Sequence, residues 1–254
     1  MFSFIQKVFQ KGFGREEEVL EEMTKKFPDF NFIHSSSFSV PPLVGNYQFY
    51  NKKILDECAL FMLIDTDLDL KMDFVTGAEK TNIDFDITQI NRNKTVIKKL
   101  NNKPPLDQYI KKLGWDYNTF QEFKWSHITA KYPIAFMKNK RIVVRPPLMI
   151  LGNYMGFLGK FDKDDVFIAR VTPDKMVDSV DEISKPMKPE FGFFTSCIAR
   201  RDFLGIKVFG IQEKMKNYFE DKDFLLIYSA GEGLHKPDEG FYYLNESLTS
   251  AIFH

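Results

Sequence analysis

Apolar residues in the first quarter of the chain change from helical spacing to short runs. Between residues 15 and 27, three glutamates open a segment that lysines close. Four apolar side chains recur along one side of it: Val19, Leu20, Met23 and Phe27. Acidic residues at the start and basic residues at the end stabilise a helix through its dipole. The apolar spacing predicts that one side of this helix packs on a core. A shorter pattern over residues 2–9 predicts another amphipathic helix, which should pack on its own domain.

The next apolar segments are short, as strands are. They are FNFIHSSSFSV at 30–40, CALFMLI at 58–64 and DLDLKMDFV at 67–75, with turn-forming residues such as 44–46 between them. We expect these segments to be strands of one sheet.

After Gly77, strand and helix patterns alternate along the chain. Strand patterns occur at 83–90, 95–100, 141–145, 154–159, 165–171, 191–196, 223–229 and 240–245. Helix patterns occur at 106–114, 117–125, 172–183 and 203–219, and NNKPP at 101–105 is the best linker candidate. This alternation predicts a mixed α/β (α+β) fold, in which sheets with antiparallel pairs are flanked by helices in one body or two lobes.

Composition and charge limit the function classes. The chain has 254 residues, of which 44% are hydrophobic, so it can bury a sizeable core. Lys plus Arg equals Asp plus Glu at 35 each, which argues against a nucleic-acid partner. The amino-terminal MFSFIQKVFQKGF is too short and polar to span a bilayer and lacks a cleavage site. We therefore expect a cytoplasmic protein without an integral membrane segment.

The two cysteines stand far apart without metal-ligand spacing. Cys58 and Cys197 belong to separate apolar segments, so neither a disulfide framework nor a zinc site is indicated. DLDLKMD and DKDD lack the calcium-loop pattern, and GNYMGFLG at 152–159 lacks a nucleotide fingerprint and predicts a hairpin.

The stretch FFTSCIARRDFLG, residues 193–205, is the first candidate site, with three interpretations. Cys197 could be a nucleophile, although TSCIA lacks the G-x-S-x-G turn and none of the four histidines is identified as its base. Ser196, backbone amides and Arg200 could instead bind a carboxylate. In the third interpretation, Ser196 and Cys197 simply end a buried strand.

The stretch YSAGEGLHKPDEG is the second candidate. Gly231 and Gly233 flank Glu232 and permit backbone angles that other residues resist, so Glu232 could sit on a turn and bind an amine. The alternative is a surface loop in which Glu232 caps amides or pairs with a lysine. His235 adds a candidate metal or haem ligand.

Six segments in order resemble the FIST domain family of small-ligand sensory domains. They are PPLDQYIKKLG, KYPIAF, RIVVRPPLMI, FFTSCIARRDFLG, YSAGEG and YYLNESLTSAIF, which cover about residues 78–254. The resemblance implies that the polar positions of the site are Arg145, Ser196, Cys197, Arg200, Glu232 and Asn245, with Glu213 matching as well. The chain departs from the family at Ala199, where glycine is usual, and at Leu244, where histidine is usual. The resemblance also implies two parts, a reduced amino-terminal half at 1–77 and a carboxy-terminal domain at 78–254.

The resulting hypothesis is a sensory protein for signal transduction that binds a small polar molecule such as an amino acid. An arginine would face the carboxylate of the ligand and Glu232 its amine. No cofactor is required, and the output would pass through a separate signalling protein or through self-association. The alternatives are a Cys197-dependent enzyme, a haem sensor that uses His34 or His235, and an interaction module without a small ligand. We favour binding over catalysis.

Overall fold

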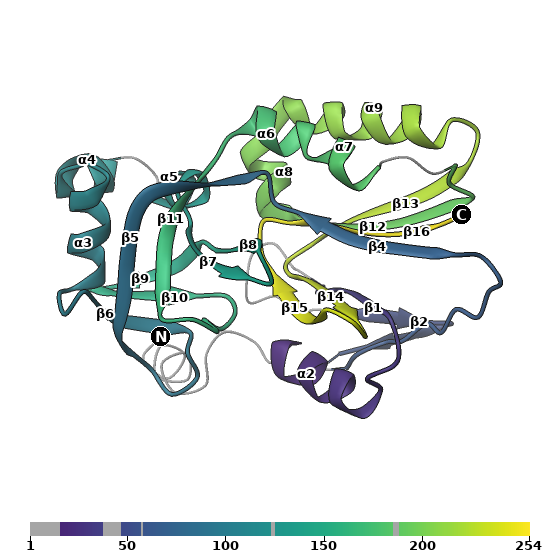
Figure 1. Ribbon diagram of the computed structural model, residues 1–254, viewed down its shortest axis with the longest axis horizontal. Coiled ribbons are helices and arrows are strands. Elements are labelled where there is room, and N and C mark those ends of the chain that lie inside the picture. The colour runs from purple at the N-terminus through teal and green to yellow at the C-terminus, as the bar shows by residue number, and fades with distance from the viewer. Residues whose placement is uncertain (1–15, 38–46, 57, 123–124, 185–187) are drawn as a thin grey trace.

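The computed structural model describes residues 16–37, 47–56, 58–122, 125–184 and 188–254 (Figure 1). It confirms the mixed α+β class, with helices flanking sheets whose strand pairs are mostly antiparallel. The helix expected at 2–9 and the turn expected at 44–46 lie outside the described residues.

The helices follow the patterns of the sequence only in part: the helices expected over 172–183 and 203–219 are each divided, and the helix over 125–131 was not expected. The helices are α2 (Glu16–Lys26), α3 (Pro105–Lys112), α4 (Tyr117–Glu122), α5 (Trp125–Lys131), α6 (Pro173–Asp178), α7 (Val180–Ile183), α8 (Ile198–Leu204) and α9 (Val208–Phe219). The helix expected over 203–219 is divided at Gly205, whose φ of 53° is left-handed. In α2, Leu20 is buried but Val19 and Phe27 are exposed, so the expected apolar face is only partly correct.

A seven-stranded antiparallel sheet forms one half of the molecule (Figure 1). Its order is β8 (Arg141–Arg145), β7 (Ile134–Lys138), β11 (Asp165–Val171), β5 (Ala78–Ile90), β6 (Val96–Leu100), β10 (Tyr154–Phe157) and β9 (Pro147–Leu151). β9 and β10 form the hairpin that the sequence predicts around Gly152. Leu106, Tyr109 and Ile110 of α3 belong to a large core cluster that also includes Phe74 and Ala251 from the other half of the molecule.

A four-stranded sheet forms the other half. Its order is β13 (Asp223–Ser229), β12 (Phe191–Cys197), β16 (Leu248–Phe253) and β4 (Leu70–Val75), with only β12 and β13 parallel. By this register, Cys197, Ser229, Leu248 and Val75 share one end of the sheet. We call this end the junction edge. In Figure 1 it lies near the middle of the molecule, beside α8 and β8.

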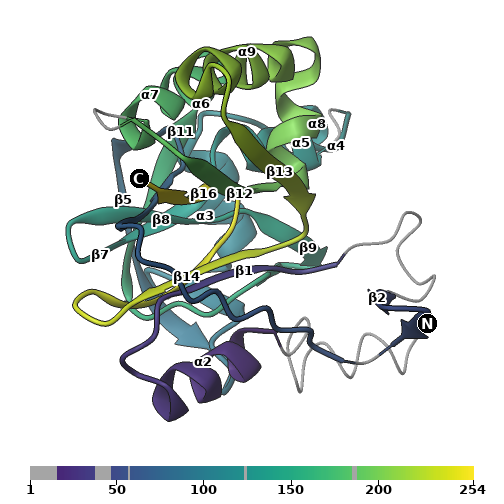
Figure 2. The ribbon, with the colours of Figure 1, turned by 90° about the vertical axis from the view of Figure 1, so that its right-hand side faces the viewer.

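Both faces of the four-stranded sheet are covered. Helices α6, α7 and α9 lie over one face, where Ile211, Met215 and Phe219 pack with Phe194 and Ile252 (Figure 1). The other face carries a three-stranded sheet of β1 (Phe32–Ser35), β14 (Glu232–Lys236) and β15 (Gly240–Leu244). Helix α2 lies beneath this smaller sheet in both ribbon views (Figure 2).

The amino-terminal strands do not form one sheet, which corrects the expectation. β1 pairs with β14, β4 pairs with β16, and β2 (Gln48–Tyr50) and β3 (Lys53–Leu55) form a separate two-stranded sheet. The partners of β1 and β4 come from the end of the chain, which local spacing does not reveal. Strands of residues 1–77 are thus hydrogen-bonded to strands of 78–254, while the division into two domains stays a prediction.

The expected strand at 58–64 is also wrong. Among the described residues of this segment no helix or strand is formed, and its large side chains are exposed. The apolar run predicted a strand because such side chains pack well on a sheet. Among the described residues, no neighbouring strand pairs with this segment, so it does not become a strand.

Candidate functional site

Buried polar side chains gather at the junction edge. They come from the end of β12, the start of α8, the end of β13, the start of β14 and the link between β15 and β16. None is more than 4% exposed: Ser196, Cys197, Arg200, Ser229, Glu232, Asn245, Glu246 and Ser247. The structure therefore brings the two candidate stretches of the sequence together with the closing LNESL segment.

Arg200 joins several segments through their backbones. Its Nη1 donates hydrogen bonds to the carbonyl oxygens of Val75, Thr76 and Glu246 at 3.4, 3.0 and 3.3 Å, and its Nη2 donates one to Met176 at 2.9 Å. Its Nε finds no partner in the described part of the chain. Burial lowers the pKa of the guanidinium to about 10, which leaves it charged at neutral pH. Both Nη atoms therefore already donate to the backbone, and Nε is the nitrogen that is left.

Arg145 ends β8 and holds the other side of the same link. Its Nη1 donates to Asn245 Oδ1 at 3.3 Å and its Nε donates to the carbonyl of Lys160 at 3.1 Å. The nearby Glu17 carboxylate opposes the lowering of the Arg145 pKa that burial causes. Arg145 and Arg200 thus contact adjacent residues, Asn245 and Glu246, through different segments.

Glu232 is the first residue of β14 rather than part of a turn, which corrects the expectation. It accepts hydrogen bonds from Ser229 Oγ at Oε1 and from Ser247 Oγ at Oε2, each at 3.0 Å. Burial raises the pKa of this carboxyl to about 8, against the opposing effect of these hydrogen bonds and of Arg200. Glu232 is therefore buried and already partnered.

The glycines beside Glu232 are needed for space. Neither Gly231 nor Gly233 has a left-handed φ. A Cβ on Gly231 would lie 2.7 Å from the Tyr243 hydroxyl, and one on Gly233 would lie 3.2 Å from both His34 Cβ and Leu20 Cδ1. The pattern GEG thus marks close packing of β14 against β1, β15 and α2.

Glu246 is a site residue that sequence reasoning missed, as it missed Ser229 and Ser247. It is 1% exposed, has a left-handed φ of 50°, and neither of its carboxylate oxygens has a hydrogen-bond partner among the described residues. Burial raises its pKa well above the usual range, the Arg200 charge opposes that rise, and the Glu232 charge adds to it. The available signal was a lone charged residue between two apolar strands in LNESL.

Ser196 and Cys197 are the last residues of β12. The Ser196 hydroxyl is buried without a partner in the described ranges. Burial raises the pKa of the Cys197 thiol well above its ordinary value, although backbone N–H groups of Ala199 and Glu246 point to it. A protonated, buried thiol is the opposite of the environment that activates a cysteine nucleophile.

The histidines proposed as haem ligands lie in β1 and β14. Burial lowers the pKa of His34 to about 4, and His235 Nε2 lies 3.1 Å from the carbonyl oxygen of Pro28. Within the described ranges, no group of three or more His, Cys, Asp and Glu side chains could hold a metal ion. No helix of that part of the chain is long and apolar enough to cross a membrane.

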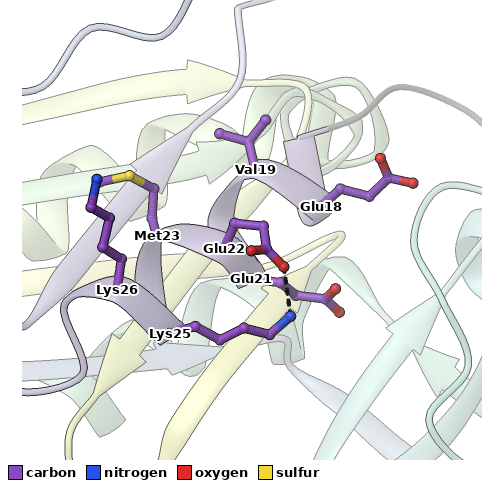
Figure 3. Close-up of a pocket in the computed structure, with 7 residues that line it drawn as sticks. All are labelled: Glu18, Val19, Glu21, Glu22, Met23, Lys25 and Lys26. Carbon is purple, nitrogen blue, oxygen red and sulfur yellow. Dashed lines mark hydrogen bonds and ion pairs between the residues drawn. The ribbon is translucent and has the colours of Figure 1, made fainter.

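A surface pocket lies on helix α2 (Figure 3). All its lining residues belong to α2: Glu18, Val19, Glu21, Glu22, Met23, Lys25 and Lys26. Figure 3 shows the Glu22–Lys25 ion pair, at 2.6 Å, on this helix surface. The pocket contains none of the candidate residues. Glu213, the further position that the resemblance implied, is exposed on α9.

Comparisons of the chain with protein-family models, with curated proteins and with solved structures found no significant match. The resemblance to the FIST family therefore stays a prediction.

Proposed function

We propose that this protein binds a small polar molecule, such as an amino acid, at the junction edge. The observation that carries the proposal is the Glu246 carboxylate, which is buried and without a hydrogen-bond partner among the described residues. Arg200 Nε and Ser196 Oγ, at the same edge, are also buried without a hydrogen-bond partner among the described residues.

The cost of these groups supports a ligand. A buried polar group without a partner destabilises a fold by about 1–3 kcal/mol, and a charged group by more. A buried polar group without a partner calls for an explanation, and a functional role is one. A ligand that carries donors and acceptors would form the missing hydrogen bonds and offset the cost. The amine of an amino acid would donate to Glu246, and its carboxylate would accept from Arg200 Nε and Ser196 Oγ.

The hydrogen bonds change the roles that the sequence suggested. Glu232 already accepts from two serines, so the amine is assigned to Glu246 instead. Both Nη atoms of Arg200 already donate to carbonyl groups, so Nε is the nitrogen assigned to the ligand carboxylate. Glu232 then supports the site through Ser247, the neighbour of Glu246.

A sensory role in the cytoplasm is the biological part of the proposal. It rests on the resemblance to small-ligand sensory domains, and it implies output through a separate signalling protein or through self-association. A cysteine-dependent enzyme is less favoured, because the Cys197 thiol is buried and protonated.

The test is a thermal-shift screen of the purified protein against amino acids, amines, small carboxylates, nucleotides and haem. A ligand at one hundred times its Kd stabilises the folded state by about 2.7 kcal/mol, which shifts the midpoint measurably. We expect a saturable shift by an amino acid, which Glu246→Gln and Ser196→Ala weaken at least tenfold.

The matched control is Glu213→Gln, since Glu213 is exposed on α9. It should bind as the unmodified protein does. Equal binding by Glu246→Gln and Glu213→Gln would remove Glu246 from the site. No shift by any compound of the screen would contradict ligand binding and favour an interaction module.

A further inference from the structure

Tyr228 adds another buried polar group to the junction edge. Its hydroxyl is buried and has no hydrogen-bond partner of normal geometry in the described part of the chain. Tyr228 is the next-to-last residue of β13 and pairs in register with Ser196, the next-to-last residue of β12. The Ser196 hydroxyl is buried without a partner as well. Two adjacent strands thus bring two unpartnered hydroxyl groups to one end of the sheet.

Both hydroxyl groups lie on the face of the sheet that the helices cover. Side chains alternate between the two faces along a strand. In β12, Phe194 lies two residues before Ser196 and belongs to the core cluster under α9. In β13, Leu226 lies two residues before Tyr228 and packs against the same cluster. Helix α9 lies over this face, and α8 begins at its junction edge (Figure 1).

Arg200 of α8 lies close to the Tyr228 hydroxyl. Burial raises the pKa of Tyr228, and the positive charges of Arg200 and Arg201 oppose that rise. Gln212 of α9 opposes it as well, although it makes no hydrogen bond of normal geometry with the hydroxyl. The tyrosine therefore keeps its proton at neutral pH and can donate a hydrogen bond.

We propose that Tyr228 is a further ligand-binding residue, and that with Ser196 and Arg200 it restricts the ligand to compounds with a free carboxylate. The inference rests on the proposed function, because it concerns the same site. The three atoms are the Tyr228 hydroxyl, Ser196 Oγ and Arg200 Nε, which are all unpartnered among the described residues. Each of them can donate a hydrogen bond.

A carboxylate fits three donors better than an amide does. Its two oxygens only accept, and together they can take about four hydrogen bonds, whereas an amide has one accepting oxygen and an NH₂ group that donates. The NH₂ group would face donors of the site and leave them unpaired. The Arg200 charge adds to the preference, since hydrogen bonds between a cation and an anion are stronger than neutral ones.

The empty protein has no structural use for the Tyr228 hydroxyl. A phenylalanine would pack its ring in the same place without a buried polar atom that lacks a partner. Such an atom destabilises the fold. A tyrosine at this position is therefore explained by a ligand that accepts its hydrogen bond.

The first test measures affinities for the standard amino acids by thermal-shift titration, and then for the carboxamide of each amino acid that binds. We expect the carboxamide to bind about 30-fold more weakly to the unmodified protein, because it leaves donors unpaired. Tyr228→Phe should weaken the amino acid about tenfold and the carboxamide less than about twofold. The control is Tyr117→Phe, which should change neither affinity, since Tyr117 is 49% exposed in α4.

The second test separates binding from support of the fold. Urea unfolding without ligand should show that Tyr228→Phe is at least as stable as the unmodified protein, because the variant removes an unpartnered hydroxyl. A hydroxyl that instead supports α9 through Gln212 would make Tyr228→Phe less stable. It would also weaken the amino acid and the carboxamide equally.

Three outcomes would overturn this inference alone. They are equal binding of amino acid and carboxamide by the unmodified protein, unchanged affinity of Tyr228→Phe for the amino acid, and equal weakening of both compounds in that variant. In each case, weaker binding by Glu246→Gln would still support the proposed function. Absence of binding by every amino acid would overturn both.

Discussion

Arg200 donates a hydrogen bond to the backbone carbonyl of Glu246 at 3.3 Å, while the Glu246 carboxylate remains without a partner among the described residues. A guanidinium and a carboxyl group thus lie in one buried site without forming an ion pair, and burial raises the pKa of that carboxyl well above its usual range. The Nη atoms of Arg200 instead donate hydrogen bonds to four backbone carbonyl groups. The result is an arginine with a structural role beside a carboxylate that is free to bind.

Removing Arg200 should destabilise the protein strongly. Arg200→Ala leaves four carbonyl groups without their donor, so we expect the free energy of unfolding to fall by about 3 kcal/mol or more. Chemical denaturation would measure this. Arg201→Ala is the control, because Arg201 is exposed on the same helix, and its effect should stay within about 0.5 kcal/mol. Equal stability of the two variants would contradict the structural role of Arg200.

Stability should fall as pH rises towards 8. The folded-state pKa of Glu232, about 8, lies above its value of 4.5 in the unfolded chain, so the folded state holds an extra proton between these values. That contribution is complete below pH 4.5 and is lost as pH rises through 8. His34, with its pKa lowered to about 4, acts oppositely but only below about pH 6.5.

The clean window for this test is therefore pH 6.5 to 8. Urea unfolding at both values should show a lower free energy of unfolding at pH 8 for the unmodified protein. Glu232→Gln should reduce this dependence, and Glu213→Gln should preserve it. Burial raises the pKa of Glu246 as well, so Glu246 accounts for the part of the dependence that remains in Glu232→Gln. A stability that rises over the window in the unmodified protein would refute the assignment.

Cys197 should resist alkylation in the folded protein. Its thiol is 4% exposed and its pKa is raised by burial, so iodoacetamide at neutral pH should label it only after unfolding. Cys58 is exposed and serves as the internal reference. Mass spectrometry of labelled peptides would separate the two. Rapid labelling of Cys197 would revive the enzyme hypothesis.

Helix α2 should depend on Glu17 for its attachment. Glu17 Oε2 accepts a hydrogen bond from the Lys160 backbone N–H at 2.8 Å, and Glu21 pairs with the Lys160 ammonium at 2.8 Å. We expect Glu17→Ala to speed amide hydrogen exchange in α2 at least tenfold. Glu22→Ala should have little effect, because Glu22 pairs with Lys25 on the exposed side of the helix. Unchanged exchange in Glu17→Ala would show that apolar contacts such as Leu20 suffice.

Elements with strong local signals were predictable. Three acidic residues and two lysines mark α2, Pro105 marks the start of α3, and Thr172 caps α6 by accepting from the Lys175 N–H. These signals act within a few residues, so the sequence carries them directly. The same holds for short apolar segments such as β8 and β11, whose bounds match the expected strands.

The candidate site was predictable only in part, and the reason is its long-range construction. The two polar stretches were visible because polar residues interrupt apolar runs at Ser196 and Glu232. For Glu246 the sequence offered only a lone charged residue between apolar segments, because its environment is made by Arg200, 46 residues earlier, and by Glu232 in β14. Side-chain hydrogen bonds of Glu232 likewise depend on Ser229 and Ser247 meeting across two strands.

Local chemistry in the chain was thus sufficient for the fold class, most helices and strands, and the polar stretches near the site. The pairing of β1 with β14 and of β4 with β16, the exposure of residues 58–64 and the isolation of the Glu246 carboxylate emerged only in three dimensions. The physical reason is that capping, dipole and periodicity effects act over one or two turns, whereas burial and hydrogen-bond partners depend on segments that are distant in the chain.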